Sequence, residues 1–135
     1  MRIRIVLMVA GLAVAGMAQA DTRATMQETL ERYTPFVGEP VESFTFWSLH
    51  KWKLAGPTKL IVWPTIKDAY LVTVEDPCPR LEWARGIGLS SQQSHQVRVR
   101  TDYVQTGGQR CRIDDIRPID LEAMDAAKRE AGPAR

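Results

Sequence analysis

The stretch that decides the fold lies between positions 97 and 114 and reads VRVRTDYVQTGGQRCRID. On both sides of Gly107-Gly108, apolar and polar residues alternate, and a period of two is typical of a β-strand with one buried face. Two such runs separated by glycines predict a β-hairpin. The rest of the chain is therefore interpreted around an antiparallel sheet.

The register of this hairpin is predicted from its two faces. A three-residue loop, 106–108, places a glycine in the left-handed position of a bulged turn. In this register Tyr103 faces Cys111 and Thr101 faces Ile113, so the apolar side chains share one face. A two-residue loop mixes apolar and charged side chains on one face, and the sequence therefore disfavours it.

Charged residues occupy the other face of the predicted hairpin. The same register sets Asp102 against Arg112, and it sets Arg100 against Asp114. The arginines of the hairpin could instead form a phosphate-binding patch. Pairing with carboxylates across the strands is the plainer interpretation, and each such pair contributes ~0.2–1 kcal/mol.

Upstream of the hairpin, the chain also has an extended pattern. Leu60 to Trp63 form a continuous apolar run, which predicts a strand buried on both faces. Between positions 44 and 54 the alternation changes phase, which indicates a bulge or bend. We predict a mainly β domain over 41–118, either a small antiparallel barrel or a strongly curved sheet, because such strands let a sheet close on itself.

One helix is predicted at each end of this β domain. Residues 21–40 are expected to form a short N-terminal helix and a linker, with Thr25 and Glu28 as a capping box. Residues 119–135 are expected to form a helix capped by Asp120 and a frayed tail.

The first twenty residues have the layout of a secretory signal peptide, 1–20. Arg2 and Arg4 precede an apolar stretch, which ends in the small-x-small site Ala18-Gln19-Ala20. The apolar stretch is too short to span a bilayer, which takes ~20 residues. The expected location is periplasmic or secreted, with no membrane span after cleavage.

Two cysteines, Cys78 and Cys111, lie in the predicted mature chain. Outside the cytoplasm, such a pair is expected to form a disulfide. Closing the loop between them stabilises the fold by about 3–4 kcal/mol in the chain-entropy model. A redox-active pair is the alternative, but the sequence has no C-x-x-C motif.

The charge balance argues against nucleic acid as a partner. Without Arg2 and Arg4, the 18 basic residues become 16, equal to the 16 acidic ones. A neutral domain exerts no long-range attraction on a polyanion. We therefore expect no nucleic-acid binding.

Catalytic residues, metal ligands and cofactor motifs are not evident in the sequence. The chain has two histidines, His50 and His95. A zinc site usually needs three or four ligands, and both cysteines are assigned to the disulfide. Ser90 lies near His95 in sequence, but polar serine-rich loops are common. No catalytic residue, metal or cofactor is predicted, and an enzymatic role is not favoured.

The tryptophans supply the candidate binding residues. Trp63 and Trp83 are expected in the core because apolar residues surround them. Trp47 and Trp52 flank the changes of phase, where an aromatic side chain can be exposed. With His50 between them, they form the candidate binding surface Trp47, His50 and Trp52.

Three further motifs are Tyr70-Leu71-Val72, Pro77-Cys78 followed by Leu81, and the block Cys111-Arg112-Ile113-Asp114-Asp115-Ile116-Arg117-Pro118. On these motifs, over about residues 41–120, the chain resembles a family of small exported proteobacterial proteins grouped as a domain of unknown function. The resemblance implies export and two partnered cysteines, and it implies no activity.

These observations favour a non-enzymatic envelope domain that binds an envelope protein or a small ligand. Two alternatives come from other classes. One is a hydrolase acting on an envelope substrate, which requires His50 or His95 to be held by a carboxylate. The other is an inhibitor of an envelope-degrading enzyme, which would present a protruding loop over 86–96.

Overall fold

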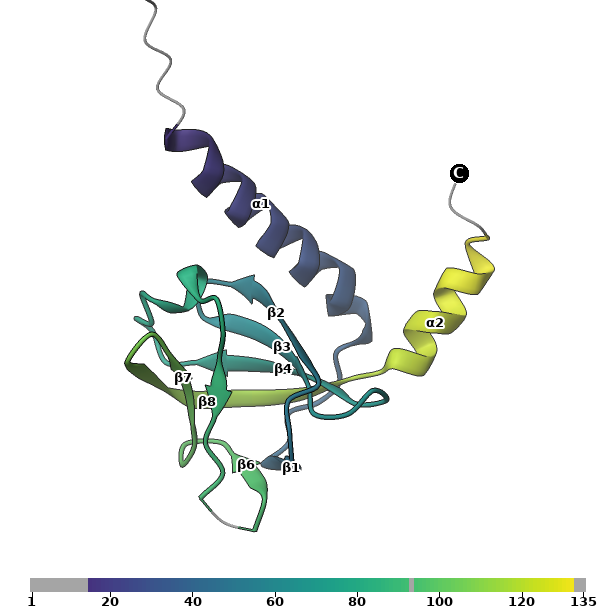
Figure 1. Ribbon diagram of the computed structural model, residues 1–135. Helices are drawn as coiled ribbons and strands as arrows, with labels where there is room; N and C mark the ends of the chain where they lie inside the picture. Colours follow the sequence, from purple (N-terminus) through teal and green to yellow (C-terminus); the bar gives the residue numbers. More distant parts are fainter. Residues whose placement is uncertain (1–14, 93, 133–135) are drawn as a thin grey trace, which may run out of the picture.

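The computed structural model describes residues 15–92 and 94–132, and it is mainly β with one helix near each end (Figure 1). This confirms the predicted fold class. The elements in chain order are α1 (Ala15–Tyr33), a 3-10 turn η1 (Thr34–Phe36), β1 (Ser43–Thr45), β2 (Lys51–Gly56), β3 (Lys59–Trp63), β4 (Ala69–Val74), a 3-10 turn η2 (Leu81–Trp83), β5 (Gly88–Leu89), β6 (Gln96–Arg98), β7 (Tyr103–Thr106), β8 (Gln109–Ile119) and α2 (Leu121–Glu130).

Six strands form one antiparallel sheet in the order β2-β3-β4-β8-β7-β5. The sheet curls, and the ribbon β1-β6 lies at one end of it (Figure 1). The long strand β8 pairs with β4 along one part and with β7 along another, and its register shifts at Thr73/Val74 on β4. Such a bulge increases the local bend, which agrees with the predicted strongly curved sheet.

Both faces of strand β3 are buried, as predicted. Leu60 and Val62 point into a core that also contains the disulfide. Ile61 and Trp63 belong to a second core, which includes residues of α1 and α2. A strand covered on both faces needs a continuous apolar run, and this explains the sequence of β3.

The N-terminal helix is longer than the sequence predicts. It begins at Ala15 and passes through the predicted cleavage site, whereas residues 1–14 of the predicted signal peptide lie outside the described residues. Thr25 therefore lies inside α1, so the predicted capping box at Thr25 and Glu28 is wrong. Helix α2 does begin as predicted, because the Asp120 carboxylate accepts a hydrogen bond from the Ala123 N–H at 2.9 Å.

The predicted register of the hairpin is wrong by one residue. Thr106 pairs with Gln109 across a two-residue turn, and Cys111 faces Val104. Gly107 and Gly108 both have left-handed backbone conformations, with φ of 53° and 80°. This is the pattern of a type I′ turn, and glycine adopts it without steric strain.

The physical reason for the error is an interruption in the first strand of the hairpin. A turn separates β6 from β7, and Arg100 in that turn has a left-handed φ of 66°. The alternation therefore shifts by one residue, so that Asp102 faces inward and is 1% exposed. The predicted pairs of Asp102 with Arg112 and of Arg100 with Asp114 are absent, and Arg100 instead pairs with Glu42 at 3.5 Å.

Candidate functional site

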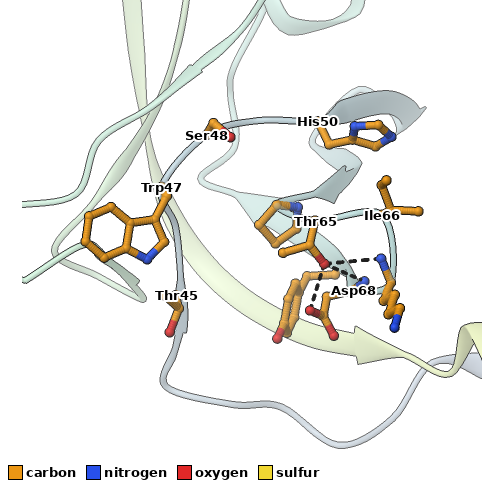
Figure 2. Close-up of a pocket in the computed structure, with 10 residues that line it drawn as sticks. Thr45, Trp47, Ser48, His50, Thr65, Ile66 and Asp68 are labelled. Atoms are coloured by element: carbon orange, nitrogen blue, oxygen red, sulfur yellow. Dashed lines mark hydrogen bonds between the residues drawn. The ribbon is translucent and has the colours of Figure 1, made fainter.

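One hollow lies between two connecting segments at one end of the sheet. One segment joins β1 to β2, and the other joins β3 to β4 (Figure 2). The hollow has a volume of about 880 Å³. It is lined by Thr45, Trp47, Ser48, His50, Pro64, Thr65, Ile66, Lys67, Asp68 and Tyr70.

Thr65 organises the turn that forms one wall of this pocket. Its hydroxyl donates to the Asp68 carboxylate at 2.8 Å and accepts hydrogen bonds from the backbone N–H groups of Lys67 and Asp68 (Figure 2). A threonine side chain that bonds its own backbone in this way fixes a turn. The turn presents Ile66 to solvent, and this side chain is 76% exposed.

Tyr70 connects the pocket to the core. Its ring stacks on Phe44 with centroids 4.6 Å apart, and Phe44 is buried in the core that contains the disulfide. Burial raises the pKa of the Tyr70 hydroxyl above its ordinary value of 10.0, and the negative charge of Asp68 raises it further. The phenol therefore stays neutral at physiological pH and can donate or accept a hydrogen bond at the pocket wall.

Trp47 forms the opposite rim and is 74% exposed. Its indole stacks on the imidazole of His95, with ring centroids 3.6 Å apart and planes inclined by 20°. The backbone reinforces this contact, since the Phe46 N–H donates to the His95 carbonyl at 2.7 Å. Figure 2 shows the indole turned away from Thr65, so Trp47 presents a broad apolar surface beside the hollow.

The structure brings together two of the three residues predicted as a binding surface. Trp47 and His50 line the same pocket. Trp52 is half-buried against the core and lines a different hollow with Met26. Sequence reasoning missed Ile66, although a single large apolar residue between the polar residues of a turn is a usable sign of exposure.

The two tryptophans predicted to be in the core have different environments. Trp63 is buried, as predicted, and its ring contacts Tyr33 edge-on at 5.9 Å. Trp83 is 55% exposed, so that prediction is wrong. Leu81 is the buried residue of the short turn η2, and Trp83 two positions later projects to the surface.

The predicted disulfide is confirmed. Cys78 and Cys111 are bonded, with Cα atoms 6.0 Å apart, and both residues are buried. The bond joins the segment before η2 to the start of β8.

Ser90, the first residue of the β5–β6 loop, has a structural role. Its hydroxyl donates to Asp102 at 2.9 Å and accepts from the Tyr103 N–H at 2.8 Å. Among the described side chains, neither His50 nor His95 has a hydrogen bond to a carboxylate. Ser90 is thus held by Asp102 rather than by an imidazole, which is the partner a serine nucleophile needs.

In the part of the chain that the structure describes, no group of three or more histidine, cysteine, aspartate or glutamate residues is placed to hold a metal ion. Within the same residues, no helix has both the length and the apolar character required to cross a membrane.

The fold and the pocket define a small disulfide-bonded β domain with an aromatic and aliphatic surface at one end of a curled sheet. The family comparison assigns the chain more narrowly. It belongs to the family of unknown function DUF6491, whose model matches residues 1–135. No match was found among curated proteins, and none among solved structures.

Proposed function

We propose that this chain is an exported, non-enzymatic domain that binds a partner protein of the cell envelope through the Trp47–Ile66 surface, which comprises Trp47, His50, Ile66 and Tyr70. The proposal of export is supported by the signal-like sequence 1–20 and by the disulfide, since disulfides persist in oxidising compartments.

One observation carries the proposal of binding. Of the three large hydrophobic side chains that are exposed among the described residues, two line the same pocket, namely Trp47 and Ile66. Scattered exposed hydrophobic residues are ordinary, but a group of them beside a hollow is typical of an interaction site. Tryptophan is also enriched among the residues that dominate binding energy at protein interfaces.

The surface is also held in place before any partner binds. Thr65 fixes the turn that carries Ile66, and His95 supports the indole of Trp47. Tyr70 is fixed by its stack on Phe44. Side chains that are already ordered lose little conformational entropy on binding, which favours affinity.

Binding is tested by affinity capture from an envelope extract, followed by a titration of the purified partner. Trp47→Ala and Ile66→Ala should each weaken binding at least tenfold, as expected for residues at the centre of an interface. Trp83→Ala removes an exposed tryptophan outside this pocket and is the matched control. If the two pocket variants retain the affinity of the unchanged protein, the proposal fails.

Export is tested separately by fractionation of cells and mass spectrometry of the mature chain. We expect a mature protein that begins at Asp21 and is found outside the cytoplasm. A cytoplasmic protein that retains Met1–Ala20 would contradict this part of the proposal without bearing on the pocket.

A second candidate function is inhibition of an envelope-degrading enzyme such as lysozyme. The observation that favours it is the stack of Trp47 on His95, because His95 lies in the 86–96 segment that an inhibitor would present. This segment contains β5 at the edge of the six-stranded sheet and ends at the first residue of β6. A lysozyme activity assay tests this candidate function. Undiminished lysozyme activity in a large excess of this protein would rule lysozyme out as the target.

A further inference from the structure

A second surface lies around η2 and the tip of the β7-β8 hairpin. It carries three exposed arginines, Arg80, Arg85 and Arg110, together with the exposed Trp83. We refer to these four residues as the arginine patch. Two hollows of about 490 and 520 Å³ lie here, and they share the residues Gly86, Thr106 and Gly107.

The arginines of the patch are not neutralised by neighbouring carboxylates. The four ion pairs between described side chains involve Arg32, Arg100, Arg112 and Arg117, and none involves the patch. Glu82 lies between Arg80 and Arg85 in sequence and is half-buried. The local formal charge therefore remains positive, although the predicted mature chain is neutral.

Two of the arginines are held by specific contacts. The guanidinium of Arg80 donates to the Gly107 carbonyl at 2.7 Å, which ties η2 to the hairpin turn. The guanidinium of Arg110 lies over the ring of Tyr103, at 4.5 Å from its centroid. Both contacts leave N–H groups that can donate to a ligand, because guanidinium has five.

The disulfide brings the two halves of the patch together. Cys78 precedes Arg80 by two residues, and Cys111 directly follows Arg110. The bond thus connects the segment that carries Trp83 to the hairpin that carries Arg110. A covalent tie of this kind pre-organises groups that come from distant parts of the sequence.

We propose that the arginine patch binds an acidic carbohydrate chain, that is, sugar rings that carry carboxylate, sulfate or phosphate groups. The planar, permanently charged guanidinium group binds such anions by paired hydrogen bonds. An exposed indole offers a flat apolar face to a sugar ring. The two hollows share lining residues and are open to solvent, so they form one shallow surface along which consecutive sugar rings can lie.

This inference does not depend on the Trp47–Ile66 surface. Trp83 and Trp47 line different hollows, and no residue lines both. Each tryptophan therefore serves as the control for the other, and failure of one proposal leaves the other standing.

The test uses heparin as the acidic chain and dextran as the neutral chain, with binding measured by calorimetry at low salt. We expect heparin to bind and dextran not to bind, with affinity falling as salt increases. Arg85→Ala and Arg110→Ala should each weaken binding about two- to fivefold, and Trp83→Ala about fivefold.

Two control variants remove the same groups elsewhere. Arg129→Ala deletes an arginine of α2, and Trp47→Ala deletes the other exposed tryptophan; both should bind heparin as the unchanged protein does. Equal losses from Arg129→Ala and Arg85→Ala would show only general charge attraction and would overturn the proposal. Binding to anionic phospholipid vesicles with no binding to heparin would overturn it in favour of a membrane surface.

Discussion

Two surfaces of this domain expose a tryptophan, and they differ in what surrounds it. Around Trp47 lie Ile66, Tyr70 and a polar turn, and the indole rests on His95. Around Trp83 lie arginines without carboxylate partners. The indole of Trp47 is therefore exposed beside apolar side chains, whereas the indole of Trp83 is exposed beside positively charged ones.

The two surfaces also differ in what holds them together. Hydrogen bonds within a turn and stacking on the core hold the Trp47–Ile66 surface. The arginine patch depends on one covalent bond and on a turn made by two glycines. Changes to the disulfide or to the glycines should therefore affect the patch first, whereas changes near Asp102 or Asp68 should affect the other surface.

The largest effect is expected from removing the disulfide. The double variant Cys78→Ser, Cys111→Ser should lower the free energy of unfolding by about 3–4 kcal/mol, because the unfolded chain is no longer cross-linked. Denaturant unfolding measures this change. Under conditions in which this double variant is folded, its affinity for heparin should fall more than its affinity for the partner protein that binds the Trp47–Ile66 surface. An unchanged stability would mean that the bond adds nothing.

The next effect concerns the buried carboxylate of Asp102. It accepts hydrogen bonds from the Ser90 hydroxyl and from the backbone N–H groups of Gln92 and Arg98, at 2.9, 3.2 and 2.8 Å. One carboxylate thus holds both ends of the segment that carries His95. Asp102→Ala leaves these donors without a partner and should cost about 3 kcal/mol.

Ser90→Ala removes one of these donors and should cost about 1 kcal/mol. NMR resolves the comparison further, because the Trp47 ring current shifts the His95 ring protons. Asp102→Ala should reduce that shift and leave the Trp83 signals unchanged. A His95 signal unaffected by Asp102→Ala would contradict this role.

The hairpin turn gives a smaller effect than Asp102→Ala. Gly108 has a left-handed φ of 80° and open space where a Cβ would lie, so Gly108→Ala tests backbone strain alone. It should cost about 1–2 kcal/mol. Gly86 also has open space and no left-handed φ, so Gly86→Ala should be close to neutral. If Gly108→Ala and Gly86→Ala were equally stable in thermal unfolding, this result would argue against the two-residue turn.

The smallest effect is expected at Tyr70. Asp68→Asn should lower the raised pKa of the Tyr70 hydroxyl only partly, because burial is the larger cause and remains. NMR titration of labelled tyrosine measures this. Since the folded pKa lies above 10.0, the stability associated with the neutral phenol is present below pH 10.0 and is lost as the pH rises through the folded value. If Asp68→Asn returned the pKa of the Tyr70 hydroxyl to its ordinary value, the charge of Asp68 and not burial would be the larger cause of the shift.

The sequence predicts most of the sheet because local patterns suffice there. The apolar run of β3 requires cover on both faces, and the Asp120 cap is a local signal; the structure confirms both. The chain has two cysteines and hence one possible pairing, which the structure also confirms. The hairpin register could not be predicted in the same way. Arg100 adopts a left-handed conformation, so the side chain of Asp102 points inward instead of outward. The Ser90 hydroxyl donates a hydrogen bond to the buried Asp102 carboxylate. Neither feature has a local signature in the chain.

The candidate site was only partly predictable for a similar reason. Trp47 and His50 stand out as residue types, but the turn that brings Ile66 beside them comes from another part of the chain. The exposure of Trp83 depends on the side of η2 that faces the core, where Leu81 is buried. Neighbours distant in sequence decide both outcomes, and composition carries no information about them.

Site-specific photo-crosslinking tests the central claim most directly. A photoreactive amino acid is placed at position 66 in cells that express the protein, and Glu122 on the exposed side of α2 is the control position. We predict one discrete crosslinked partner from position 66, which disappears when Trp47→Ala is added, and none from position 122. No adduct at position 66, or the same adduct from both positions, would contradict the assignment of the Trp47–Ile66 surface as a binding site.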